Sequence, residues 1–185
     1  MSSWQPKSFV FLTLLLFPTQ SFAQADRFEL GQRLRAFERA WDRCESLTAK
    51  QRTTTPLIKV MPAFFGLRFG EAAQLLDEAR HLLDSHPDVP VETRWAESLQ
   101  LRTGTRLVDA ETREVSFLLR RFYEVQGEIP QGAQLRIQIG EAPPQTFPIE
   151  MLPLKGTISL EAIPGSLSID WECVSEIVIG EQSRT

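Results

Sequence analysis

The apolar residues of this 185-residue chain change their spacing near His86-Pro87-Asp88-Val89-Pro90. Before this segment they recur every three or four residues, which predicts helices, and after it they alternate with polar residues, which predicts strands. The prolines of the segment are typical of a boundary. We therefore expect an α+β protein, with an N-terminal α-helical hairpin over 26–87 followed by an immunoglobulin- or fibronectin-like antiparallel β-sandwich over 88–185.

Two apolar stripes define the expected hairpin. One apolar residue occurs at each helical turn of the first stripe, which comprises Leu30, Leu34, Phe37, Trp41 and Cys44. The second comprises Ala72, Leu75, Leu76, Ala79, Leu82 and Leu83. Between the stripes, Thr55-Pro56 has the composition of a helix start, and Pro62 is expected to interrupt or kink the short helix that follows.

Short runs with a period of two residues define the expected sandwich. A more continuous apolar run over 115–123 suits a central strand, and glycine- and proline-containing turns separate the others. The alternating runs are 135–139, 147–151, 158–161 and 167–173, with further strands expected at 99–101, 107–108 and 177–179.

The first 25 residues have the pattern of a signal peptide. Lys7 precedes an apolar run over 9–17, and small residues lead to cleavage near Ala23 or Ala25. The run is too short for a membrane span, which needs about 20 apolar residues. We therefore expect an exported protein, periplasmic or extracellular.

Charge restricts the expected partners. Removal of residues 1–25 removes one positive charge, Lys7, and leaves 19 basic and 24 acidic side chains, a net charge of −5. Nucleic-acid and anionic-lipid partners favour a basic surface, so we expect neither. No later apolar run approaches spanning length, so no membrane span is expected in the mature chain.

The chain has two cysteines, Cys44 and Cys173. In an exported protein they can form a disulfide, which in the chain-entropy model stabilises a loop of this length by about 4–5 kcal/mol. Both also have the phase of buried residues, so each can instead be a small core side chain. The sequence leaves both alternatives open.

Catalytic motifs are missing from the sequence. There is no G-x-S-x-G, H-E-x-x-H, C-x-x-C or glycine-rich phosphate loop, and the two histidines, His81 and His86, lie close together. We therefore predict no catalytic, cofactor-binding or metal-binding residues.

Two groups of residues offer weaker alternatives to this prediction. Asp77, His81 and Asp84 share one helix face, where they fit a metal site or, by default, a solvated polar face. Three carboxylates, Asp109, Glu111 and Glu114, suit glycosidase-type acid–base chemistry or an exposed loop.

Three tryptophans follow the predicted signal peptide. Trp41 and Trp171 have the phase of core residues. Trp95 lies beside Arg94 at the domain junction, where it can be exposed for binding or seal the hairpin against the sandwich; we favour the second role.

The run from Phe28 to Glu38 with Trp41, together with Phe64-Phe65 and Gly70-Glu71-Ala72, resembles the N-terminal region of exported bacterial α/β-hydrolase-type proteins. In those proteins a helical segment and a β-sandwich precede the catalytic domain. The resemblance covers mostly residues 27–84 and implies an accessory module without an active site, so no catalytic residue is carried over.

These observations favour an exported, non-enzymatic binding or accessory module that engages a protein or cell-envelope partner. The alternative function is a carboxylate-dependent hydrolase that acts on envelope polymers.

Overall fold

The computed structural model describes residues 20–83, 88–104, 112–140, 142–160, 173–179 and 182–184. Five helices precede seven strands in these residues, which confirms the α+β class. The helices are α1 (Gln20–Arg43), α2 (Leu47–Arg52), α3 (Thr54–Phe65), α4 (Phe69–Leu83) and α5 (Val91–Glu97). The strands are β1 (Leu99–Thr103), β2 (Glu114–Arg121), β3 (Gln134–Ile139), β4 (Gln145–Pro148), β5 (Leu154–Ser159), β6 (Cys173–Ile179) and β7 (Gln182–Arg184).

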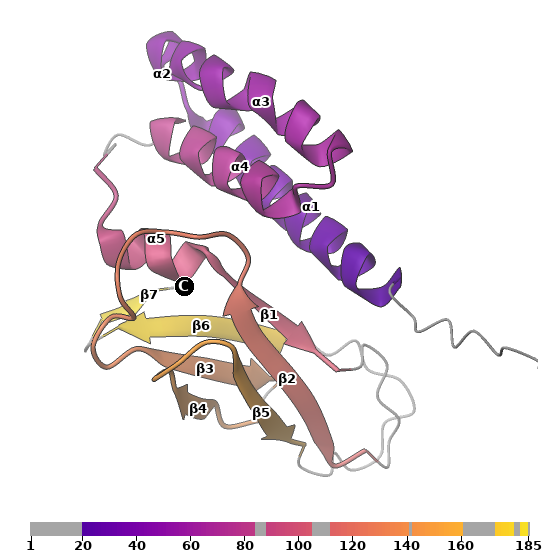
Figure 1. Cartoon of the computed structure of the whole chain (residues 1–185). Helices are drawn as coiled ribbons and strands as arrows, with labels where there is room; N and C mark the ends of the chain where they lie inside the picture. The colour runs from indigo at the N-terminus through magenta and orange to yellow at the C-terminus, as the bar shows by residue number, and fades with distance from the viewer. Residues whose placement is uncertain are drawn as a thin grey trace, which may run out of the picture.

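Helices α1 to α4 form one layer beside the sheets (Figure 1). Helix α4 packs against both α1 and α3, because alanines on its buried face allow close approach. The core of this layer contains Leu30 from α1, Ala63 from α3, and Phe69, Ala72, Ala73 and Leu76 from α4. None of the described helices is long and apolar enough to cross a membrane.

The expected interruption at Pro62 is wrong, since α3 continues through Pro62 to Phe65. A proline inside a helix removes the hydrogen bond to the carbonyl four residues earlier, here that of Ile58. Ile58 is 69 % exposed and Pro62 is also exposed, so water can replace the lost bond. A proline at the solvent side is therefore tolerated.

The buried face of α1 differs by one residue from the expected stripe. Leu30 and Phe37 are buried, whereas Leu34 is 44 % exposed. Arg33 takes the inner position, where its guanidinium binds Asp77 of α4. Arg33, rather than Leu34, therefore faces α4.

The strands form two small antiparallel sheets. One sheet has the order β1-β2-β5 and the other β4-β3-β6-β7. In the first sheet, Leu119 of β2 lies opposite Leu101 of β1 and Leu154 of β5. In the second, Leu135 of β3 lies opposite Phe147 of β4 and Ile177 of β6.

Residues from both sheets share one apolar core. Phe117 of the first sheet packs edge-on against Phe147 of the second, with ring centroids 4.7 Å apart. Trp95 of α5 is 1 % exposed and belongs to the same core. This confirms that Trp95 is buried, while its role as a seal between the hairpin and the sandwich stays a prediction. Helix α5 was not expected, because its seven residues are too few for a clear periodicity.

Some predictions concern residues outside the described ranges. They are most of the signal peptide, the strand at 107–108, the part of the 167–173 strand before Cys173, and Trp171. Both predicted cleavage positions, Ala23 and Ala25, fall within α1. The signal peptide stays a prediction.

Candidate functional site

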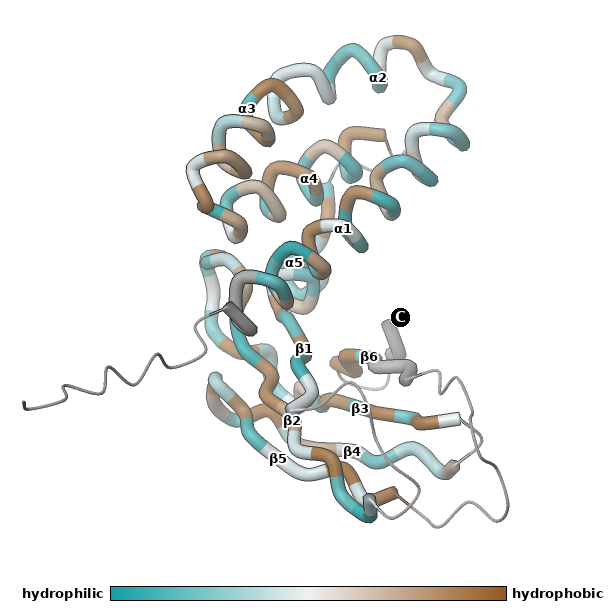
Figure 2. The backbone as a smooth tube through the Cα atoms, turned by 90° about the vertical axis from the view of Figure 1, so that its right-hand side faces the viewer, coloured by the Kyte–Doolittle hydropathy of each residue, from teal (hydrophilic) through white to brown (hydrophobic). Residues whose placement is uncertain are grey.

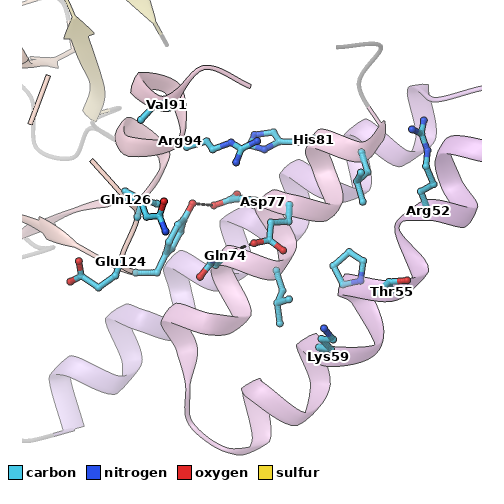
Figure 3. Close-up of a pocket in the computed structure, with 16 residues that line it drawn as sticks. Arg52, Thr55, Lys59, Gln74, Asp77, His81, Val91, Arg94, Glu124 and Gln126 are labelled. Atoms are coloured by element: carbon cyan, nitrogen blue, oxygen red, sulfur yellow. Dashed lines mark hydrogen bonds between the residues drawn. The ribbon is translucent and has the colours of Figure 1, made fainter. Parts of the chain in front are cut away.

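A cleft of about 770 Å³ runs along α4, a volume typical of ligand-binding clefts. Figure 3 shows Arg52 and Lys59 on one side of α4, and Val91 and Arg94 of α5 on the other. The segment after β2 completes this second wall with Tyr123, Glu124, Val125 and Gln126.

The floor of the cleft follows from the amphipathic pattern of α4. Its alanines and Leu76 are buried toward α1 and α3, which leaves a second stripe directed into the cleft. The cleft-lining residues of this stripe are Gln74, Leu75, Glu78, His81 and Leu82. Leu75 and Leu82 are half-buried, so the floor offers apolar contacts between polar groups.

A buried ion pair closes the base of the cleft. Asp77 of α4 binds Arg33 of α1 and accepts a hydrogen bond of 2.8 Å from the Tyr123 hydroxyl. Arg33 also donates to the carbonyl oxygens of Glu97 and Leu99, at 2.7 and 3.3 Å. Burial and the Asp77 carboxylate raise the pKa of Tyr123 above its ordinary range, which keeps this hydroxyl a proton donor.

A second cluster lies one turn further along α4. Glu97 of α5 binds Arg80 and lies 2.9 Å from His81 Nε2. Although burial opposes it, the hydrogen bond from His81 and the positive charge of Arg80 lower the pKa of Glu97. His81 thus lines the cleft with its Nε2 beside this carboxylate.

A third cluster fixes the N-terminal part of α1 to the first sheet. Asp26 binds Arg102 of β1 and, at 2.7 Å, Arg120 of β2. Arg120 also donates to Gln100, which is 2 % exposed. The three clusters together form a polar junction that joins the helical layer to the sheets.

The cations on the walls of the cleft have no such partners. Arg52, Lys59 and Arg94 are exposed, and the structure shows no side-chain hydrogen bond or ion pair for them among the described residues. By contrast, Glu78 accepts a hydrogen bond from Gln74, and Glu124 pairs with Arg121. The cleft-lining side chains without a partner are therefore the cations, while Glu78 and Glu124 keep their negative charge.

The described residues do not form the metal site or the carboxylate site that the sequence offered as alternatives. Asp77 and His81 are bound to Arg33 and Glu97, and Asp84 lies outside the described ranges. No group of three metal-ligating side chains occurs among the residues searched. Asp109 and Glu111 also lie outside, while Glu114 is exposed at the start of β2.

The disulfide between Cys44 and Cys173 stays a prediction. Cys44 follows α1 and packs beside Phe37, Ala79 and Leu83, as expected from the first stripe. Its thiol lies 3.8 Å from the carbonyl oxygen of Ser46. The side chain of Cys173 lies outside the described part of the structure.

Sequence reasoning missed the residues that build this junction. No role was predicted for Arg33 and Glu97, and Tyr123 was placed only at the end of the expected 115–123 strand, whereas β2 ends at Arg121. The available signal was Arg33 itself, since it falls between Leu30 and Phe37 on the side that α1 buries. Its partner Asp77 is 44 residues away, beyond the reach of local periodicity.

Comparisons with protein families, curated proteins and solved structures give no match to this chain. The chemistry of the cleft must therefore be inferred from its own residues. Its base is held by mutually bonded ions, its floor is partly apolar, and its walls carry unpaired cations. This arrangement suits recognition of an anionic, partly apolar ligand.

Proposed function

We propose that this protein is a non-catalytic binding module whose cleft holds an acidic, extended segment of a partner protein. The observation that carries the proposal is the set of unpaired cations, Arg52, Lys59 and Arg94, around an apolar floor. Carboxylates of the partner bind these cations, while its apolar side chains contact Leu75, Leu82 and Val91.

The base of the cleft supports binding rather than catalysis. A general base or nucleophile needs a free proton-accepting or attacking group directed at the ligand. Asp77 is occupied by Arg33 and Tyr123, and the ring of His81 by Glu97. These groups hold the walls in place, so that the cleft is preformed.

The architecture supports the finer fold proposal. The orders β1-β2-β5 and β4-β3-β6-β7 have the pairing pattern of an immunoglobulin- or fibronectin-like sandwich, and the two sheets share one core. We propose that the C-terminal part is such a sandwich and that α1 and α4 form the helical hairpin, with α2 and α3 inserted between them. Sandwiches of this type are common recognition scaffolds.

Export and an accessory role belong to the same proposal. The signal-peptide pattern supports a periplasmic or extracellular location, and the resemblance to exported hydrolase N-terminal regions supports an accessory role. The partner is then an exported or envelope protein with an acidic segment.

The test is a fluorescence anisotropy titration with two labelled peptides. One peptide alternates glutamate with leucine, and the other alternates glutamine with leucine. We expect tighter binding of the glutamate peptide, weakened about two- to fivefold by either Lys59→Ala or Arg94→Ala, as exposed charge pairs predict. Equal binding of the two peptides would contradict the proposal.

The matched control is Arg35→Ala. Arg35 is an exposed arginine of α1 that does not line the cleft. Its replacement changes the net charge by the same amount and should leave the affinity unchanged. An equal loss in this variant would show that only overall charge is being sensed.

A further inference from the structure

Strand β5 is an edge of the first sheet. The strand order is β1-β2-β5, so β2 pairs with one side of β5 and no described strand pairs with the other. Figure 2 shows β5 at the margin of this sheet, beside β2. A strand in such a position presents backbone N–H and C=O groups that another extended chain can bind.

Three residues of β5 direct their backbone groups to this open side. Leu160, just after β5, donates from its amide to the carbonyl oxygen of Arg113, on the side of β2. Because hydrogen bonding alternates along an antiparallel pair, the even-numbered residues of β5 also bond to β2. The odd-numbered residues, Lys155, Thr157 and Ser159, therefore turn their N–H and C=O groups away from β2, and their side chains are exposed.

The side chain of Gln145 already occupies one of these three positions. Its amide nitrogen donates to the carbonyl oxygen of Ser159 at 2.7 Å, and its amide oxygen accepts from the Ser159 N–H at 3.0 Å. A primary amide that makes both bonds reproduces the donor and the acceptor that one residue of a neighbouring strand presents. Lys155 and Thr157 have no such partner among the described residues, so two positions of the ladder stay open.

The side chains along the edge determine which kind of strand fits it. Lys155 is exposed, and none of the ion pairs in the described residues includes it, so an acidic side chain on an added strand can pair with it. Leu154 belongs to the opposite, core-facing side of β5 but is only half-buried. An apolar side chain on that side of an added strand can cover it. The edge thus fits a segment that alternates acidic and apolar residues.

A hollow of about 670 Å³ lies at the start of β5. Its lining includes Lys155, Leu118 of β2, and Met151 and Leu152 from the segment before β5. Met151 is 70 % exposed. A strand that runs along β5 reaches this hollow at one end, where an apolar side chain gains contacts that the short ladder does not supply.

We propose that the open edge of β5 binds an extended, amphipathic segment of a partner protein as an additional strand of the first sheet. The backbone of the segment bonds to Lys155 and Thr157, and its acidic and apolar side chains give specificity. A second copy of this chain is a poor occupant, since edge-to-edge pairing places the two Lys155 side chains close together on one face. No residue of β5 lines the cleft along α4, so this surface is separate from the one proposed above.

The test is amide hydrogen exchange of the full chain, measured residue by residue by NMR. The probe is a peptide that alternates glutamate with leucine. At saturation, exchange of the Lys155 and Thr157 amides should slow at least about tenfold, because each amide gains a hydrogen bond. Binding in the cleft alone would leave both amides unchanged, so failure of this proposal is distinct from failure of the cleft proposal.

Two methylated peptides are matched probes of the strand geometry. Residues opposite Lys155 and Thr157 share their exposed face, so these are the glutamates, and their backbone groups face β5. Methylation of the glutamate nitrogens should therefore weaken binding at least about tenfold, through the loss of two hydrogen bonds. Methylation of the leucine nitrogens, which face away from β5, should leave the affinity unchanged.

Two variants of the protein should shift the affinity in opposite directions. Thr157→Pro removes an outward N–H, which an edge strand tolerates, and should weaken binding about three- to tenfold. Gln145→Ala frees the backbone groups of Ser159 and should strengthen binding by a similar factor, which a loss of fold cannot do.

The proposal is overturned if neither amide slows at the highest soluble peptide concentration. It is also overturned if both methylated peptides bind alike, or if Gln145→Ala binds no more tightly than the wild type. Slower exchange of the Lys155 and Thr157 amides with rising protein concentration, without peptide, would overturn it as well, since the edge would then pair with a second copy.

Discussion

The junction and the outer side of α3 distribute their residues in opposite ways. The outer side of α3 and the turn after it expose Ile58, Met61, Phe65 and Leu67, which are called the apolar ridge. The junction buries charged side chains, with Arg33 and Asp77 only 10 and 8 % exposed, whereas the ridge exposes Phe65 and Ile58. Burying ions requires that each has a partner, so the junction holds one geometry. Exposed apolar groups contribute little to the fold. The comparison teaches that the charged residues inside this protein are structural and the apolar residues outside it are available for binding.

The largest effect is expected from removing half of the central ion pair. Asp77→Ala leaves the buried Arg33 with Glu29 as its one carboxylate partner in the described structure and should lower the free energy of unfolding by about 3–5 kcal/mol. Urea unfolding measures this loss. The double variant Arg33→Met with Asp77→Leu should be more stable than Asp77→Ala, because apolar groups of similar size leave no unpaired charge. A double variant as unstable as the single one would show that the pair acts through more than its charges.

A smaller loss is expected at Glu97. Glu97→Gln removes the charge that Arg80 and His81 share and should cost about 1–2 kcal/mol at neutral pH. Because the folded-state pKa of Glu97 lies below its ordinary value of 4.5, the stabilisation is present above pH 4.5 and is lost as the pH falls through the folded-state pKa. The difference between wild type and variant should thus shrink under acid conditions. If the stability difference between wild type and Glu97→Gln stayed the same under acid conditions, protonation of Glu97 would not account for the pH dependence.

The hydroxyl of Tyr123 should contribute about 1 kcal/mol, the usual value for one hydrogen bond. Tyr123→Phe removes its bond to Asp77 while it keeps the ring beside Arg33. Tyr123 is the only tyrosine of the chain, so its ionisation can be followed directly by ultraviolet absorbance. Since its pKa is raised above 10, the folded protein should show no tyrosinate where a free tyrosine has ionised, and the resulting stabilisation should be lost as the pH rises above 10. Ionisation near pH 10 without unfolding would place the hydroxyl in water.

The sequence predicted the α+β class and much of the secondary structure, since both depend on local periodicity. Leu30, Phe37, Ala72 and Ala79 were found in this way, as were the strands around Leu135 and Ile177. Arg33 was not found, because a charged residue on a buried face is explained only by its distant partner Asp77. The same limit applies to the cleft, whose walls come from segments that are far apart in the chain.

Two local rules failed for a shared reason. Pro62 was expected to interrupt or kink a helix, and residue 67 of a Schellman turn, here Leu67, is expected to be glycine. Both residues have exposed side chains at the C-terminal end of α3. The preferences of single residues for a backbone conformation constrain the chain least where it is exposed to solvent. The two exceptions therefore occur at the exposed end of α3 and not at the junction.

The smallest effect is expected at the ridge, where Ile58→Ser should change the free energy of unfolding by no more than about 0.5 kcal/mol. Ile58 is 69 % exposed, so serine there removes little buried surface. Ala63→Ser, on the buried side of the same helix, is the comparison variant. Ala63 is fully buried, so an added hydroxyl group is expected to disturb the packing and to lower the free energy of unfolding by more than the change at Ile58 does. Urea unfolding of both variants decides the question. A loss at Ile58 as large as that at Ala63 would mean that the ridge stabilises the fold, and the contrast between a structural interior and an available exterior would then fail at α3.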